Sequence, residues 1–288
     1  MLYHYTSLQG LMGIINSKSI WASNSDYLND HSEYSHLFNL VSDYINKNYF
    51  DDDYLSPYSF SVQMNRPKYG NKNPQVFIGS FSESSDLLSQ WRGYCPESGG
   101  ICIGFNRESL ERMVKASGYE LKKCIYLEEE QNKIVAEVVE KSILEFPKLV
   151  EDRSVYVKLP DREQWQKANE LNEYVSKGEG KVQADKVVSE LYTSISGLAP
   201  LIKHTSFKEE VEWRIICKNP NTKTMFREAN TYLVPYIALD IEPDFISEII
   251  IGPNANSERC LKSVKDFLML NGFENINYKI SEIPLNSW

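Results

Sequence analysis

The chain has 288 residues, of which 42% are hydrophobic, 12% aromatic and 25% charged. This composition is typical of a folded globular protein and excludes an intrinsically disordered chain. A formal net charge of −9 also excludes a protein that holds long nucleic acids through bulk positive charge, because such binding needs a basic face that displaces counterions. A phosphate-bearing ligand of dinucleotide size is not excluded on this ground.

The sequence lacks targeting and crosslinking signals. No stretch approaches the ~20 apolar residues of a membrane span, and the first residues lack the basic and apolar regions of a signal peptide. The five cysteines are odd in number and form no C-x-x-C pair, which argues against a disulfide framework and a zinc ribbon. We therefore expect a cytoplasmic protein with reduced cysteines, no membrane partner and no bound metal.

The first part of the chain predicts alternating strands and helices. Alternating side chains predict a strand over residues 2–6, and Ser7 is a suitable N-cap for the helix that follows. A second strand is expected over 19–23 and a helix over about 31–46. Residues 47–75 are rich in Asp, Asn, Pro and Lys without a sustained period, which predicts a long loop.

The remaining strands are predicted on both sides of a helical segment. Residues 128–198 are charged, periodic and almost free of strand signals, which predicts a mainly helical insertion or subdomain. Short strands around such a segment favour a single α+β domain over 1–288, with a mixed or antiparallel sheet, over a doubly wound parallel sheet. The expected strands are 76–82, 101–105, 211–217, 231–239, 246–251 and 276–280, and the expected helices are 84–94 and 256–271.

A first polar cluster lies in the opening strand, at His4-Tyr5-Thr6. An imidazole at a strand end can bind a sugar hydroxyl, and the Thr6 hydroxyl can assist it. The alternative is that His4 only bonds the backbone, which is the commoner role of an isolated histidine.

A second cluster combines two aromatic residues with an arginine. Trp91 and Tyr94 are three residues apart, so on a helix they share a face and can form an aromatic wall. Arg92 beside them can clamp a phosphate or carboxylate with its planar guanidinium. The alternative is an amphipathic helix that docks both rings into the core.

A third cluster lies in a late strand. In an extended chain Glu210, Glu212 and Arg214 point to one face, and the apolar residues between them point to the other. The polar face is either a solvated surface ion pair or the wall of a polar cleft. Two carboxylates this close can also raise the pKa of one of them, as in catalytic pairs. A weaker cluster, Asn29-Asp30 with Glu33, is explained by a helix cap.

Taken together, these segments resemble the bacterial domain of unknown function 2971 (DUF2971) family. The resemblance covers nearly the whole chain in the same order, with residues 128–198 as a helical spacer. The stretches that carry it are Leu2–Ser7, Ile20–Ser23, Asn29-Asp30 with Glu33, Phe77–Ser82, the Trp91…Tyr94 block with Gly100–Phe105, and Lys203-His204 with Glu210-Val211-Glu212-Trp213-Arg214.

The opening strand is in turn similar to the first motif of the ADP-ribosyltransferases, which include DNA-targeting toxins and RNA 2′-phosphotransferases. This similarity implies a split mixed sheet that binds NAD as a co-substrate, although the S-T-S strand of the arginine-modifying class is missing. It implies the following roles: His4, Tyr5 and Thr6 at the ribose and nicotinamide amide, Tyr94 or Trp91 as the stacking ring, Arg92 and Arg214 at the pyrophosphate, and Glu212 or Glu210 as the catalytic carboxylate.

The resemblance thus predicts an NAD-dependent ADP-ribosyltransferase-like enzyme, with the role of a toxin or phage-defence effector that modifies nucleic acid or protein. A carboxylate suits this chemistry because it stabilises the oxocarbenium charge that develops on the ribose. Two alternatives stay open: a nucleotide-binding sensor without turnover, and a structural interaction module. A basic strip formed by Arg92, Lys203, Lys208 and Arg214 is expected to receive the phosphates of the ligand.

Overall fold

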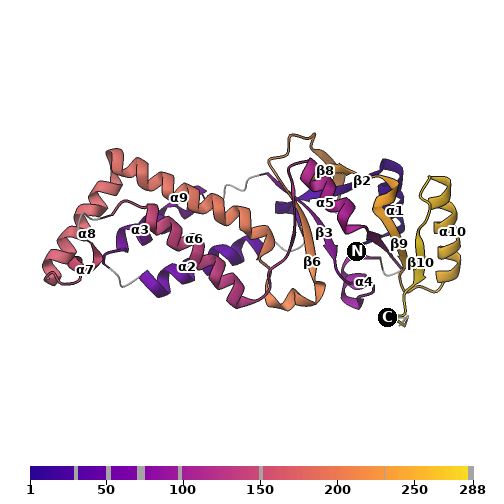
Figure 1. Cartoon of the computed structure of the whole chain (residues 1–288), viewed down its shortest axis with the longest axis horizontal. Helices are drawn as coiled ribbons and strands as arrows, with labels where there is room; N and C mark the ends of the chain where they lie inside the picture. Colours follow the sequence, from indigo (N-terminus) through magenta and orange to yellow (C-terminus); the bar gives the residue numbers. More distant parts are fainter. Residues whose placement is uncertain are drawn as a thin grey trace. The chain divides into compact units, whose positions relative to one another are not determined.

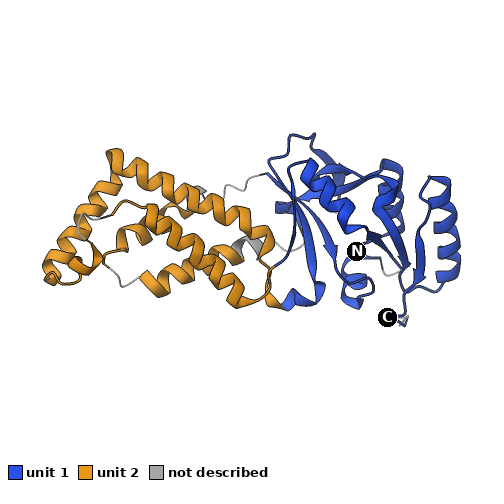
Figure 2. Ribbon diagram, viewed as in Figure 1, with its two compact units in different colours: residues 1–29, 75–124, 206–288 blue, residues 30–74, 125–205 orange. Residues whose placement is uncertain are grey.

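The computed structural model describes residues 1–28, 32–49, 53–69, 75–96, 99–148, 152–229 and 231–284. The chain divides into two compact units, shown in Figure 2. Unit 1 comprises residues 1–29, 75–124 and 206–288, and unit 2 comprises residues 30–74 and 125–205. The helices expected at 128–198 therefore belong to a unit that also contains residues 30–74, which the sequence did not connect with them.

Unit 1 is built on one mixed sheet. Its strands are β1 (Leu2–Thr6), β2 (Ser19–Asn24), β3 (Val76–Ser82), β4 (Ile101–Phe105), β5 (Glu120–Lys123), β6 (Glu212–Lys218), β7 (Met225–Glu228), β8 (Leu233–Asp240), β9 (Ile246–Ile251) and β10 (Asn277–Ile280). They follow the order β10-β9-β4-β1-β3-β2-β8-β7, and β6 pairs with both β3 and β5. β9 and β10 pair in parallel, whereas β3 and β6 run antiparallel and side by side (Figure 1). This confirms the predicted α+β class and mixed sheet.

Helices cover one face of this sheet. They are α1 (Leu8–Ser17), α5 (Arg107–Ala116) and α10 (Ser257–Leu270), and a shorter helix, α4 (Leu88–Tyr94), follows β3. Buried residues at helical spacing, such as Leu11 and Ile15 of α1 or Val264 and Leu268 of α10, pack onto buried strand residues in one apolar core. Ser7 caps α1 as predicted, accepting a hydrogen bond of 3.0 Å from the backbone N–H of Gly10.

The pairing of the sheet is split along one edge of β3. β1 meets this edge where Tyr3 opposes Ser82, and β2 meets it further along, where Ser23 opposes Ile78. Between these points, no strand among the described residues pairs with this edge. β1 and β2 therefore diverge, with α1 as the connection between them.

Unit 2 is a bundle of helices. They are α2 (Ser32–Tyr49), α3 (Ser56–Tyr69), α6 (Glu128–Glu145), α7 (Arg153–Tyr156), α8 (Asp161–Ser176) and α9 (Gly178–Leu198). The long loop predicted over residues 47–75 is wrong, because α3 occupies about half of it and the end of α2 extends into it. This helix is polar in sequence, but Tyr58 and Val62 are buried in the core of the unit, and the Tyr192 hydroxyl donates to the Val62 carbonyl at 2.9 Å.

A close approach in unit 2 leads to a stability prediction. A Cβ atom on Gly180 in α9 would collide with the backbone carbonyl and ring of Tyr174 in α8. Gly180→Ala is therefore expected to lower the free energy of unfolding by about 1–3 kcal/mol. The control is Gly13→Ala in α1, where the added Cβ meets nothing within 4 Å and should raise stability by about 0.5–1 kcal/mol. Urea unfolding measures the stability of both variants. If Gly180→Ala stabilises the protein as much as Gly13→Ala does, the close packing of Gly180 against Tyr174 is contradicted.

The described residues show no metal-binding group, membrane-spanning helix or disulfide bond. They contain no group of three or more His, Cys, Asp or Glu side chains that could hold a metal ion. None of their helices is both long and apolar enough to cross a membrane. All five cysteines are free thiols.

Candidate functional site

The two faces of the sheet in unit 1 differ in polarity. Residues directly opposed in neighbouring strands point to the same face. Tyr3 opposes Ser82, and Ser82 opposes Glu212, so these three share a face, which we call the polar face. The other face carries the apolar core and its helices. By the same register, the polar face also carries Tyr5, Ser80, Cys102, Lys122, Arg214, Glu248 and Lys279.

A buried ion pair lies on the polar face. Glu212 and Arg214 are two residues apart in β6, so both side chains project to the same side. The Arg214 Nε and Nη2 atoms donate to Oε1 and Oε2 of Glu212 at 2.9 and 3.1 Å. Only 6% of Glu212 and 3% of Arg214 is exposed. A solvated surface pair is therefore excluded, and the pair has the two-point geometry of a strong charge-assisted contact.

Glu210 does not share this face in the way the sequence predicted. β6 begins at Glu212, and Glu210 is the last residue of a 3-10 helix, η3 (Thr205–Glu210). Val211 between them has a φ of +40°, a value that a β-branched residue adopts only under strain. The strand alternation therefore stops at Glu212. The Glu210 carbonyl oxygen accepts a hydrogen bond of 2.7 Å from the Ser82 hydroxyl.

His4 lies at the split in the sheet. Its Nδ1 atom is 3.0 Å from the backbone oxygen of Ser80, within the part of the β3 edge that no described strand pairs with. Its ring centroid is 6.0 Å from that of Phe81 on the apolar side. His4 and Glu212 therefore project from opposite faces of the sheet. Ser80 connects them, because its backbone contacts His4 and its side chain shares the polar face with Arg214.

The burial of His4 predicts a pH dependence of stability. Desolvation lowers the pKa of its imidazole below the ordinary 6.5, so the unfolded chain binds a proton more readily than the folded one. The free energy of unfolding should therefore fall as the pH drops below 6.5. Urea unfolding between about pH 5 and 8 should show this slope, and it should be smaller in His4→Asn, which has no titrating ring. If the unfolding free energy depends equally on pH in the wild type and in His4→Asn, the pH dependence does not come from His4.

Tyr5 and Trp91 belong to a small buried apolar cluster on the polar face, together with Cys102 and Ile250. Tyr5 and Trp91 are each 6% exposed, and their rings meet edge to face with centroids 4.7 Å apart. The Tyr5 hydroxyl donates to the Ser84 carbonyl at 2.9 Å, and the Trp91 indole donates to Asp86 at 2.7 Å. Burial raises the pKa of Tyr5 well above its usual range.

The predicted aromatic wall is therefore wrong. Trp91 is buried against Tyr5, whereas Tyr94 of the same helix is 46% exposed, and Arg92 is exposed as well. Of the two rings, only Tyr94 presents a large surface to a ligand. Thr6 is half-buried at the end of β1, against Gly10 in the first turn of α1.

The predicted basic strip is not a surface feature. Lys203 and Arg214 are each 3% exposed, whereas Arg92 and Lys208 are exposed. A phosphate-bearing ligand therefore meets no continuous row of these four cations.

The weaker cluster predicted at Asn29-Asp30 with Glu33 is not described in full, because Asn29 and Asp30 lie outside the described residues.

The sequence missed a second buried carboxylate on the polar face. Glu248 in β9 is 4% exposed. It accepts hydrogen bonds from the Tyr3 hydroxyl at 3.1 Å and the Asn277 amide at 2.8 Å, and Lys279 Nζ lies 2.6 Å away. Burial and the hydrogen bond to Glu248 raise the pKa of the Tyr3 hydroxyl to about 12. A single Glu in a strand otherwise rich in isoleucine was the only available signal, since its partners are distant in sequence.

The family of the central segment follows from a comparison with known proteins. Residues 90–215 match the family described as "protein of unknown function (DUF2971)". The resemblance to DUF2971 is confirmed over these residues. No curated protein and no solved structure matches the chain.

The DUF2971 segment contains part of each unit. It begins in α4, includes the helices of unit 2 from α6 to α9, and ends in β6. It therefore includes Trp91, Arg92, Tyr94, Glu212 and Arg214, whereas the opening strand lies outside it.

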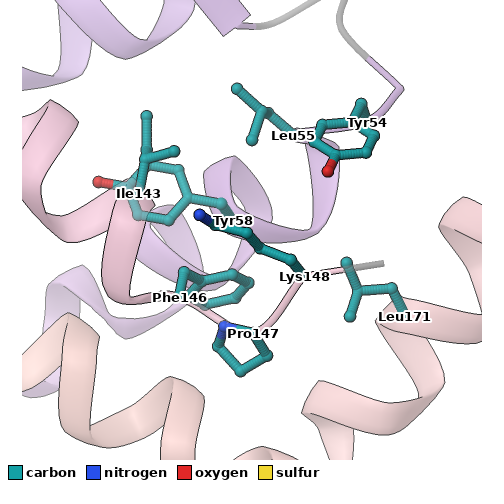
Figure 3. Close-up of a pocket in the computed structure, with 8 residues that line it drawn as sticks. All are labelled: Tyr54, Leu55, Tyr58, Ile143, Phe146, Pro147, Lys148 and Leu171. Carbon is teal, nitrogen blue, oxygen red and sulfur yellow. The ribbon is translucent and has the colours of Figure 1, made fainter. Parts of the chain in front are cut away.

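A small hollow in unit 2 is too narrow for a ligand. Figure 3 shows its mainly apolar lining, which includes Leu55, Tyr58, Phe146 and Leu171. Its volume is about 10 Å³, at the lower limit for a single water molecule. The hollow is a packing defect of the bundle and no binding site.

Proposed function

We propose that unit 1 binds NAD and acts as an ADP-ribosyltransferase-like enzyme. The observation that carries this proposal is the Glu212–Arg214 pair on the polar face, beside the split in the sheet where His4 lies. Ser80 and Ser82 add hydroxyl groups on the same face. A carboxylate, a guanidinium and hydroxyls are the groups that recognise ribose and phosphate.

In the proposed reaction Glu212 acts on the nicotinamide ribose. Its carboxylate accepts a hydrogen bond from the 2′-hydroxyl and stabilises the oxocarbenium charge as the bond from C1′ to the pyridinium nitrogen breaks. The electron pair of that bond leaves with nicotinamide. A lone pair of the acceptor then forms the new bond to C1′, and the acceptor loses a proton. Arg214 is a positioning residue that keeps Glu212 ionised and oriented.

The proposed role of His4 depends on the tautomer of its ring, and those of Tyr94 and Arg92 depend on the exposure of their side chains. Because the Ser80 oxygen is an acceptor, His4 Nδ1 carries the proton, and its Nε2 is the acceptor of a neutral ring. Because this ring projects from the face opposite Glu212, the proposal assigns His4 the positioning of the Ser80 backbone and no contact with the ribose. The exposed Tyr94 ring stacks on nicotinamide, and the exposed Arg92 binds the pyrophosphate. The biological role as a toxin or phage-defence effector belongs to the same proposal.

One observation favours a second candidate function. Glu212 is almost fully buried and held at two points by Arg214, which is also the arrangement of a structural pair. A nucleotide-binding sensor without turnover would use unit 1 to bind the ligand and the helices of unit 2 to contact a partner. This candidate requires NAD binding but no bond cleavage.

The two candidates are separated by incubating the full chain with NAD labelled on the adenylate. Protein, DNA, RNA and cell extract are supplied as acceptors, and both nicotinamide release and label transfer are measured. Release with transfer supports the enzyme, and binding without release supports the sensor. If calorimetry detects no NAD binding and no acceptor yields nicotinamide, both are overturned.

A further inference from the structure

A large pocket opens in unit 1 where two strands end. β1 and β9 both pair antiparallel with β4, so they run in the same direction and finish at the same edge of the sheet. α1 begins after β1, and α10 begins after β9 (Figure 1). The pocket between these two starts has a volume of about 700 Å³, within the range of small-molecule sites. The carboxyl ends of parallel-running strands are a common place for such sites.

The lining of the pocket favours an anion. Among the described residues that line the pocket, Arg259 is the one with a charged side chain, and the lining also includes Ser7, Gln9, Asn254 and Asn256. The first turn of α1 contains no acidic residue, whereas that of α10 contains Glu258, which does not line the pocket. Asn256, the N-cap of α10, makes no side-chain hydrogen bond to its helix. The pocket therefore combines a guanidinium and amide groups with the positive ends of two helices.

The rim of the pocket is fixed by its own contacts. Gly99 has a φ of +116°, and a Cβ atom there would come within 2.8 Å of Asn254, so the backbone itself forms the wall. The Gly252 N–H donates to the Gly100 carbonyl at 2.9 Å. Asn254 donates to the Gly252 carbonyl at 2.9 Å and accepts from the Asn256 N–H at 2.8 Å. A preformed rim lowers the entropy that binding costs.

We propose that this pocket binds a nucleoside monophosphate, with the phosphate between the N-termini of α1 and α10 and against Arg259. The volume leaves room for the nucleoside beside the phosphate, and Leu8 and Pro96 supply apolar wall for the base. None of the residues assigned to the ADP-ribosyltransferase chemistry lines the pocket. The inference therefore does not depend on the proposed function.

The test is calorimetric titration of the full chain with AMP, adenosine and inorganic phosphate. AMP should bind, inorganic phosphate should bind more weakly, and adenosine should not bind detectably. Arg259→Gln should weaken AMP binding at least tenfold. Lys262→Gln is the matched control, because Lys262 is an exposed cation on the same helix that does not line the pocket; it should leave AMP affinity unchanged.

Several results would overturn the proposal. They are equal affinity for adenosine and AMP, equal weakening in the Arg259 and Lys262 variants, or no binding of AMP. Glu212→Gln separates this site from the proposed enzyme. AMP binding that survives in a folded Glu212→Gln protein supports an independent pocket, and its selective loss there would overturn that independence.

Discussion

Replacing Glu212 with glutamine is expected to slow the proposed ADP-ribose transfer strongly and to destabilise unit 1. The substitution removes the negative charge and leaves the Arg214 guanidinium buried without it. Breaking a buried ion pair in this way costs about 3–5 kcal/mol. Loss of the carboxylate from a transition state that develops positive charge should lower the rate of nicotinamide release roughly 10²–10³-fold.

The matched control for this prediction is Glu210→Gln. It makes the same chemical change two residues away, in η3 rather than in β6. We expect its nicotinamide release to stay within about threefold of the wild type and its unfolding free energy to change by less than about 1 kcal/mol. If Glu210→Gln is the more damaging substitution, Glu212 is not the catalytic carboxylate.

A double substitution separates stability from chemistry. Replacing a buried ion pair by apolar residues of similar size is often neutral or stabilising. Glu212→Leu combined with Arg214→Met is therefore expected to regain most of the stability lost in Glu212→Gln, but no activity. Urea unfolding and nicotinamide release are measured on the same preparations. Recovery of both properties would show that the pair is only structural.

Replacing Asp86 with alanine is expected to lower the free energy of unfolding by about 3 kcal/mol, through the loss of charge-assisted hydrogen bonds. The Asp86 carboxylate accepts from the Trp91 indole at 2.7 Å, the Ser281 hydroxyl at 2.6 Å and the Glu282 N–H at 3.0 Å. It thus ties α4 to the segment that follows β10. Without it, a buried indole N–H loses its partner.

The measurement combines urea unfolding with amide hydrogen exchange. Faster exchange is expected at Glu282 and Ile283, because their N–H groups bond Asp86 and the Ser281 hydroxyl that Asp86 holds. Asp266→Ala is the control, since Asp266 is exposed on α10 and its loss should change stability by no more than about 0.5 kcal/mol. Equal effects of the two substitutions would contradict a structural role for Asp86.

Local pattern was sufficient for most elements. The alternation at Leu2–Thr6 and the apolar runs at β3, β4 and β9 were predicted as strands, because each depends on residues close in sequence. α3 was missed, since its sequence is polar and its burial comes from contacts with helices far along the chain. β5 and β7, each four residues long with no fully buried residue, were too short to give a period.

The candidate site shows the same division. Strand alternation correctly placed Glu212 and Arg214 on one face, but it extended to Glu210 because nothing in the sequence reveals the positive φ of Val211. The spacing of Trp91 and Tyr94 predicted that both rings line one aromatic wall. The packing of Trp91 against Tyr5 decided otherwise, and this contact depends on strand neighbours that the sequence does not specify.

Composition and local spacing were enough to predict the α+β class, the helical character of residues 128–198, the DUF2971 resemblance and the residue types available for chemistry. Three properties could be seen only in the folded chain: His4 and Glu212 project from opposite faces of one sheet, the Glu212–Arg214 pair is buried, and the ends of β1 and β9 form one pocket. These properties are set by strand order and register, and both depend on pairings between residues far apart in the chain.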